Sequence, residues 1–195
     1  TGGKIGFCGE SSTIKAALAS VHNWEEPPIS GTKGSGTIFF TGCNLKCVFC
    51  QNYSISSEHS GKEISVERLS EIMLEQQARD VHNINLVTAV HFVPSVIKAV
   101  EKARQNGLTI PIVYNSSGYE KADTIKMLEG TVDIYLPDIK YFSSKLSAKY
   151  SSAPDYFEYA SAAVKEMHRQ CGNVIFDENG IMQKGIIIRH LILPS

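Results

Sequence analysis

The 195-residue sequence lacks any apolar run near the ~20 residues that a helix needs to cross a bilayer, and it lacks a signal-peptide pattern. It also lacks an excess of either charge, because 19 Lys and Arg residues balance 20 Asp and Glu residues and leave a net charge of −1. Such a chain is not drawn as a whole to phosphate backbones or anionic membranes. We therefore expect no nucleic-acid partner, no membrane partner and a cytoplasmic location.

Cysteine is scarce and unevenly spaced. The five cysteines lie at positions 8, 43, 47, 50 and 171, so that three of them fall within eight residues. The odd number and the clustering argue against a disulfide framework, which spaces its cysteines more evenly. Clustered thiols in a chain of this composition predict a metal centre.

No internal repeat or low-complexity segment divides the chain, and its length is typical of one domain. Residues 1–36 are rich in Gly, Ser and Thr and predict an irregular N-terminal lead-in, with at most a short helix near residues 14–21. From residue 37 onward, β-rich runs alternate with helical patterns and a hairpin turn. The expected strands cover residues 37–41, 85–90, 110–115, 132–136 and 186–193, and the expected helices include 119–129 and 156–171.

Alternating strands and helices with short connections predict an α/β fold with a parallel sheet and right-handed crossovers. The alternation alone leaves open a barrel or an open, doubly wound sheet. In both architectures ligands bind where the parallel strands end. The residues that directly follow each expected strand are therefore the candidates for a functional site.

The sequence GCNLKCVFCQN occupies residues 42–52 and directly follows the first expected strand. Thiolates at spacings of four and three residues can converge on one metal centre from a single loop. A four-iron cluster held by three cysteines leaves one iron without a protein ligand. A structural zinc ion would need a fourth ligand, and the loop does not contain one. We therefore favour a [4Fe-4S] cluster bound by Cys43, Cys47 and Cys50 over zinc.

At these residues the chain resembles the radical S-adenosylmethionine superfamily, whose signature is three cysteines at this spacing with an aromatic residue, here Phe49, before the third. Residues 39–52 look like the branch of pyruvate formate-lyase activating enzymes. The run DIYLPDIK at residues 133–140 resembles that branch's strand ending in Asp-x-Lys, and RHLILP at 189–194 resembles its later Arg-containing strand. The nearest resemblance is to uncharacterised activating-enzyme homologues, which often carry further cysteines upstream of the core.

The resemblance implies a partial (β/α)6 TIM-like barrel over residues 37–195, truncated at both ends, with residues 1–36 as the remnant of a Cys-containing segment. It implies that S-adenosylmethionine chelates the open iron and is cleaved to methionine and a 5′-deoxyadenosyl radical. The cofactor supplies the difficult chemistry, and the protein positions it. The implied partners are a glycyl radical enzyme as protein substrate and a flavodoxin- or ferredoxin-type electron donor.

The resemblance also places several side chains near S-adenosylmethionine. Phe49 would pack near the adenine. Asp138 and Lys140 follow the fourth expected strand and project to the same side, although a surface ion pair is the alternative interpretation. Arg189 interrupts an apolar strand, so it must be paired or face a polar cavity. Its guanidinium fork would suit a cofactor carboxylate, and a buried salt bridge to Asp138 is the alternative.

Two strand ends depart from the branch's pattern. Where the activating enzymes have Gly-Gly-Glu, this chain has His91 followed by Phe and Val, and where they have Asp-Thr it has Asn115 and Ser116. We expect these three residues to line the site. A hydrogen-bonded structural histidine and an ordinary helix-capping turn are the alternatives.

The leading functional hypothesis is a radical enzyme that installs a glycyl radical on a partner protein. A radical enzyme acting on a small molecule or on another protein residue keeps the same chemistry. A ferredoxin-like electron carrier would use four cysteines for its cluster. A zinc-stabilised interaction module is the remaining alternative.

Overall fold

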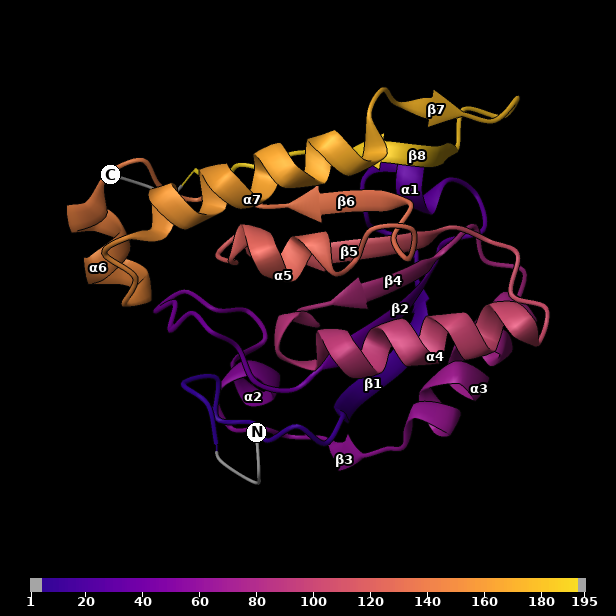
Figure 1. Ribbon diagram of the computed structural model, residues 1–195, viewed down its shortest axis with the longest axis horizontal. Coiled ribbons are helices and arrows are strands. Elements are labelled where there is room, and N and C mark those ends of the chain that lie inside the picture. The colour runs from indigo at the N-terminus through magenta and orange to yellow at the C-terminus, as the bar shows by residue number, and fades with distance from the viewer. Residues whose placement is uncertain (1–4, 193–195) are drawn as a thin grey trace.

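A single eight-stranded sheet organises the computed structural model, which describes residues 5–192 (Figure 1). The strand order is β3-β1-β2-β4-β5-β6-β8-β7, and the five strands β2, β4, β5, β6 and β8 run parallel to their neighbours in that series. β1, β3 and β7 pair antiparallel at the two ends of the sheet. The bounds are β1 Lys15–His22, β2 Ser35–Phe40, β3 Lys62–Glu63, β4 Ile84–Val87, β5 Ile112–Ser116, β6 Ile134–Pro137, β7 Ile175–Phe176 and β8 Met182–Ile186.

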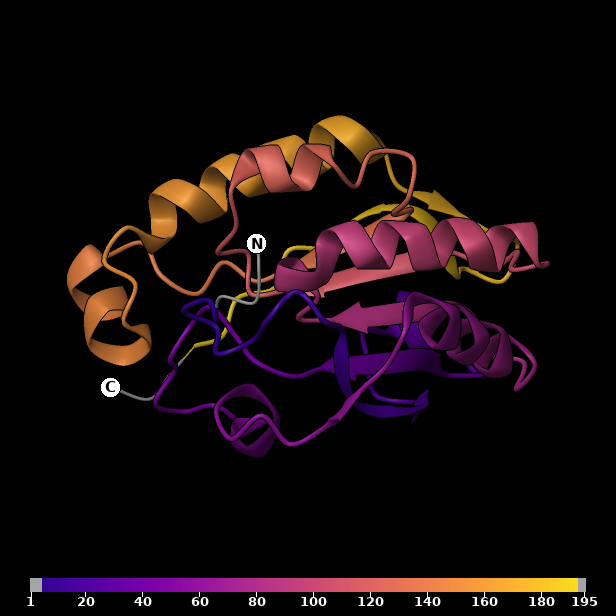
Figure 2. The same cartoon turned by 60° about the horizontal axis from the view of Figure 1, so that its bottom comes forward.

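Four helices, α3, α4, α5 and α7, pack on one face of the sheet and bury the main hydrophobic core (Figure 2). Apolar residues that recur every three or four positions form these helix faces, and alternate strand residues form the opposing surface. The helices are α1 Pro27–Ser30, α2 Tyr53–Ser56, α3 Val66–Gln77, η1 Val90–Phe92, α4 Val93–Gln105, α5 Ala122–Lys126, α6 Ser144–Ser151 and α7 Tyr156–Cys171.

The opposite face of the sheet has a smaller core under α1. Ile29 of α1 is fully buried there against Val113, Ile134 and Leu136 of the central strands. The next residues along the same face of these strands, toward their carboxyl ends, are Asn115 and Asp138. The interior therefore changes from apolar to polar toward the carboxyl ends of the parallel strands.

The sheet is open, because the hydrogen bonds among residues 5–192 do not join β3 to β7. A doubly wound sheet carries helices on both faces, whereas here the long helices share one face, as they do around a barrel. The fold is thus mixed α/β with an unclosed sheet. None of the described helices is both long and apolar enough to cross a membrane.

The prediction of an irregular lead-in with a short helix near residues 14–21 is wrong. Residues 15–22 form β1, which pairs antiparallel with β2 along Ala19↔Ile38 and neighbouring positions. Alanine and leucine are good helix formers, but intrinsic helix propensity is a small effect. The edge of β2 offers a row of backbone hydrogen-bond partners that outweighs it.

The last expected strand, 186–193, is also shifted. The regular strand β8 begins at Met182 and ends at Ile186, and the chain then continues beside β6 through a single bridge, Asp138↔Arg189. Gly185, the last but one residue of β8, adopts a φ of 135°, which residues other than glycine rarely take. Residue 193 lies outside the described residues.

Candidate cofactor-binding site

A cavity of about 580 Å³ opens at the carboxyl ends of the parallel strands. It is the place where a parallel α/β sheet ordinarily binds its ligand. Nine of the ten residues that the sequence predicts for the site line this cavity: Cys43, Cys47, Phe49, Cys50, Asn115, Ser116, Asp138, Lys140 and Arg189.

Strand register brings these distant residues together. Asn115 pairs with Leu136 in the β5–β6 ladder, and Ser116 pairs with Pro137, so that Asp138 follows directly at the sheet edge. The bridge between Asp138 and Arg189 then brings the last segment of the chain to the same edge. Each polar residue comes just after the point where its strand leaves the core.

The cysteine loop follows β2 and is held by backbone hydrogen bonds to the end of α6. Lys46 N donates to Ser151 O at 3.1 Å, and Val48 N donates to Tyr150 O at 2.9 Å. Gly42 begins the loop with a φ of 77°, and a Cβ there would lie 2.8 Å from the Cys8 carbonyl oxygen. Glycine is thus needed where the chain passes the N-terminal segment.

The three loop thiols are free and half-buried, and each has its own hydrogen-bond partner. Leu45 N donates to Cys43 Sγ at 3.4 Å, Cys47 Sγ lies 2.9 Å from Ser151 Oγ, and Cys50 Sγ lies 3.3 Å from Ser56 Oγ. Burial raises the pKa of Cys43 to about 11 and also raises that of Cys47, so both stay protonated without a metal. A bound metal would favour the thiolate form instead.

Three thiols on one loop are the donor type that holds an iron–sulfur cluster. Among the described residues, Cys, His, Asp and Glu side chains do not gather in threes closely enough to hold one metal ion. In a four-iron cluster each thiolate binds a different iron, so the three sulfur atoms need to surround the cluster without meeting at one point. Cys171 lies in the core on the helix-covered face, and Cys8 is buried in the N-terminal segment.

Charged side chains form a connected network at the cavity wall. The Lys140 ammonium donates to Asp138 Oδ2 at 2.6 Å, and Arg189 Nε donates to Asp138 Oδ1 at 3.0 Å. The Arg189 guanidinium also donates to Asn115 Oδ1 at 2.7 Å. The salt bridge considered as an alternative for Arg189 is thus present, and the same side chains line the cavity.

Sequence reasoning missed Glu25, which enters the cavity from the segment between β1 and α1. Glu25 Oε2 accepts hydrogen bonds from the amides of Asn85 and Asn115, each at 3.0 Å. Arg189 Nη1 lies 3.9 Å from the same oxygen, and His22 Nε2 lies 3.9 Å from Oε1. Two adjacent glutamates before a Pro-Pro pair are the available signal, but in an expected irregular lead-in they have no defined position.

His91 lies outside the lining of the cavity. Its Nε2 is 2.7 Å from Thr41 O, and burial lowers its pKa, so a neutral ring donates this hydrogen bond to the backbone that leads into the cysteine loop. The structure therefore gives His91 a structural contact, and a role in cofactor binding stays a prediction. Thr88, which does line the cavity, has a φ of 60° that is unusual for a β-branched residue.

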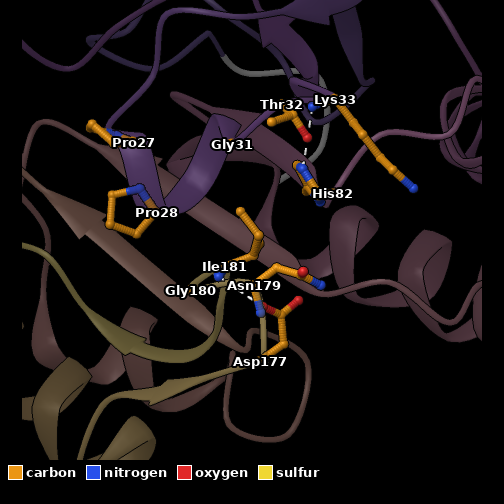
Figure 3. A pocket seen from close by; sticks show the side chains of 10 residues that line it. All are labelled: Pro27, Pro28, Gly31, Thr32, Lys33, His82, Asp177, Asn179, Gly180 and Ile181. Atoms are coloured by element: carbon orange, nitrogen blue, oxygen red, sulfur yellow. Dashed lines mark hydrogen bonds between the residues drawn. The ribbon is translucent and has the colours of Figure 1, made fainter.

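A second cavity, of about 690 Å³, lies at the other end of the sheet interior beside α1 (Figure 3). Two of its charged side chains, Lys33 and Asp177, are already engaged. Lys33 pairs with Asp80 at 2.9 Å, and the carboxylate of Asp177 accepts from the backbone of Asn179 and Ile181. None of the residues predicted for the site lines it.

Comparison with known proteins shows similarities to a protein family, a relative and a solved structure. The family model described as the Radical SAM superfamily matches residues 37–177. The uncharacterized protein MJ0674 of Methanocaldococcus jannaschii is 32% identical over 166 residues, which cover 83% of this chain and 45% of that protein. The chain thus spans less than half the length of this relative. The crystal structure of QueE from Escherichia coli aligns with a TM-score of 0.44 at 10% identity, over 93% of this chain and 85% of that one.

Proposed function

The chain belongs to the radical SAM superfamily, and we propose that it cleaves S-adenosylmethionine reductively at a [4Fe-4S] cluster bound by Cys43, Cys47 and Cys50. The observation that carries the proposal is that these three thiols share one cavity with Asp138, Lys140 and Arg189 at the carboxyl ends of parallel strands. When bound, the cluster supplies the electron that breaks a carbon–sulfur bond of S-adenosylmethionine and leaves methionine and a 5′-deoxyadenosyl radical.

The chain's own residues bind and orient the cofactor in this proposal. Lys140 uses one of its three ammonium donors on Asp138. In the described part of the chain, the carboxylate oxygens nearest to Arg189 Nη1 lie at 3.8 and 3.9 Å, beyond hydrogen-bond distance. Both cations therefore keep donors for a carboxylate or for hydroxyl groups. Phe49 supplies an apolar surface in the same cavity, suited to packing against an adenine ring.

The test is anaerobic reconstitution with iron and sulfide, reduction with dithionite, and addition of S-adenosylmethionine. We expect 5′-deoxyadenosine and methionine in equal amounts, detected by chromatography. The Cys50→Ala variant, treated in the same way, is the control and should form neither. A wild-type chain with a full cluster that forms no 5′-deoxyadenosine would refute the proposal.

For the substrate, we propose a backbone glycine of a glycyl radical enzyme. Support comes from the resemblance of residues 39–52, 133–140 and 189–194 to the activating-enzyme branch. The reaction should give a doublet in the electron paramagnetic resonance spectrum when glycyl radical proteins from the same source are added. Formation of 5′-deoxyadenosine without this doublet, for every such protein, would leave a different protein residue or a small molecule as the substrate.

A further inference from the structure

Glu25 is held at both its backbone and its carboxylate in the wall of the cavity that the cysteines share. Its backbone N–H donates to the hydroxyl of Ser30 in α1 at 2.8 Å, and Ser30 is buried. Its Oε2 accepts from two asparagine amides on the neighbouring strands β4 and β5, Asn85 and Asn115 (Figure 1). These contacts fix the direction in which the Glu25 carboxylate faces.

Asn85 lowers the stability of the fold at its own position. The residue is fully buried on the face of β4 opposite to the main core, and its Oδ1 has no hydrogen-bond partner within residues 5–192. A buried polar oxygen without a donor is destabilising, and an apolar side chain would avoid this cost. The hydrogen bond that the Asn85 side chain does make goes to Glu25. We therefore interpret Asn85 as a residue that orients Glu25.

Asn115 connects Glu25 to Arg189. Asn115 Nδ2 donates to Glu25 Oε2 at 3.0 Å, and Asn115 Oδ1 accepts from Arg189 Nη2 at 2.7 Å. An ionised carboxylate can only accept hydrogen bonds and a guanidinium can only donate them. Glu25 therefore determines which end of the amide faces Arg189. With the amide reversed, its NH2 group would face the guanidinium and the hydrogen bond would be lost.

Asparagine is the residue type that this connection needs. Aspartate at position 115 could accept from Arg189, but it would set a second carboxylate against Glu25. Leucine has a similar shape and could bond to neither neighbour. A side-chain amide donates at one atom and accepts at another, so it can join an acceptor to a donor.

We propose that Glu25 is a positioning residue for cofactor binding, which acts through Asn115 on the guanidinium of Arg189. The inference rests on the proposed function, in which Arg189 binds S-adenosylmethionine. Hydrogen bonds from Nε to Asp138 and from Nη2 to Asn115 hold the guanidinium at two of its nitrogens. A planar group held at two points has a fixed orientation, and so do the donors of Nη1. Without Glu25 the Asn115 contact is no longer fixed, and the guanidinium can turn about its contact with Asp138.

Glu26 provides a matched control. Arg189 Nη1 lies 3.8 Å from Glu26 Oε1 and 3.9 Å from Glu25 Oε2, so each glutamate places a carboxylate at nearly the same distance. Of the two, Glu25 is the one that accepts from Asn115 in the described chain. A carboxylate near Arg189 repels the carboxylate of the cofactor, so the loss of its charge alone should strengthen binding. The loss of positioning should weaken binding, and the two effects therefore have opposite signs.

The test measures S-adenosylmethionine binding to the reconstituted, unreduced protein by equilibrium dialysis, which needs no turnover. We expect Glu25→Ala to bind about tenfold more weakly than wild type, and Glu26→Ala to bind as tightly as wild type or more tightly. Glu25→Gln keeps a side-chain oxygen for the two amides and should recover most of the affinity. Circular dichroism checks that each variant is folded. If Glu25→Ala does not fold, Glu25→Met takes its place, because it keeps the side-chain volume without the acceptor.

A double-mutant cycle separates positioning from a general loss of structure. In the Arg189→Ala background, Glu25→Ala should change the affinity by less than about twofold, whereas a general loss of packing would weaken both backgrounds equally. Equal effects in the two backgrounds would overturn the proposal, and so would equal weakening by Glu25→Ala and Glu26→Ala or an unchanged affinity in Glu25→Ala. A wild-type protein with a full cluster that does not bind S-adenosylmethionine would instead refute the proposed function.

Discussion

Glu120 is a buried carboxyl group beside the site, and it should make the stability of the protein depend on pH. The side chain is 3% exposed, and its Oε2 accepts a hydrogen bond from Tyr114 Oη at 2.8 Å. Its Oε1 is buried without a partner in the described part of the chain. Burial raises the pKa of Glu120 from 4.5 to about 7. The folded protein therefore holds a proton that the unfolded chain has already released at pH 6.

The sign of the effect follows from proton binding. Between pH 4.5 and pH 7 the folded state binds more protons than the unfolded state, so the free energy of unfolding falls as the pH rises. The contribution is fully present below pH 4.5 and is lost by the time the pH has passed the folded pKa. A shift from 4.5 to about 7 corresponds to about 3 kcal/mol, of which roughly 2–3 kcal/mol is lost between about pH 5 and 8.

Glu120→Gln tests this reasoning, because glutamine keeps the size and the hydrogen-bond acceptor but cannot ionise. Urea unfolding of wild type and variant at a series of pH values gives the two profiles. The wild-type free energy of unfolding should fall by roughly 2–3 kcal/mol more than that of the variant from about pH 5 to 8. Tyr114→Phe removes a hydrogen bond that lowers the Glu120 pKa, so the pKa should rise in this variant. The fall in its free energy of unfolding should therefore extend to higher pH. Parallel wild-type and Glu120→Gln profiles would show that Glu120 does not titrate in this range.

Three further outcomes are expected at the site. Alanine at any one of the three loop cysteines should abolish iron binding and the visible absorbance of the cluster, whereas Cys171→Ala should retain both. Loss of the cluster in Cys171→Ala would contradict a cluster in which one iron has no protein ligand. Alanine at Asp138, Lys140 or Arg189 should weaken S-adenosylmethionine binding by about tenfold to a hundredfold, since a charged hydrogen bond contributes ~1.5–3 kcal/mol. Equilibrium dialysis measures the affinity. Unchanged affinity in all three variants would leave these residues with a structural role alone. Glu25→Ala should lower the free energy of unfolding by roughly 1–3 kcal/mol, because two buried asparagine amides lose their acceptor. Urea unfolding at neutral pH measures this change, and an unchanged free energy would show that these hydrogen bonds do not stabilise the protein.

The elements that the sequence predicted well have local signals. Helix α7 spans residues 156–171 as expected, because its apolar positions recur at helical spacing and Gly172 ends it. The turn before β8 follows from the Asp177 carboxylate, which accepts hydrogen bonds from the backbone two and four residues later. Such features depend on a few neighbouring residues and can be identified without the fold.

The elements that the sequence missed depend on distant partners. The strand β1 forms because β2 presents a free edge to it, and neither segment carries that information alone. Without the pairing of β1 on β2, the position of Glu25 does not follow from the sequence. Its carboxylate reaches amides on β4 and β5, 60 and 90 residues along the chain. A side chain that is placed by a long-range strand pairing has no local pattern to identify it.

Arg189 shows why a structural and a functional role need not exclude each other. Its guanidinium holds Asp138 through Nε and Asn115 through a terminal nitrogen, which accounts for a charge within the otherwise apolar segment that follows β8. A purely structural arginine would be expected to use its remaining N–H donors in hydrogen bonds to the protein as well. Instead, within residues 5–192, the carboxylates near Nη1 lie beyond hydrogen-bond distance, and the side chain lines the cavity that the cysteines share.

The two roles of Arg189 can be separated by experiment. Lysine at this position keeps the charge but loses the planar fork that engages two partners at once. A structural role alone predicts that Arg189→Lys lowers stability and leaves S-adenosylmethionine affinity unchanged. If the free donors of Arg189 bind the cofactor, the affinity for S-adenosylmethionine should fall even under conditions where Arg189→Lys is fully folded. In the proposed function the cofactor binds the guanidinium donors that the protein leaves free, so the loss of affinity should exceed what the loss of folded protein can explain.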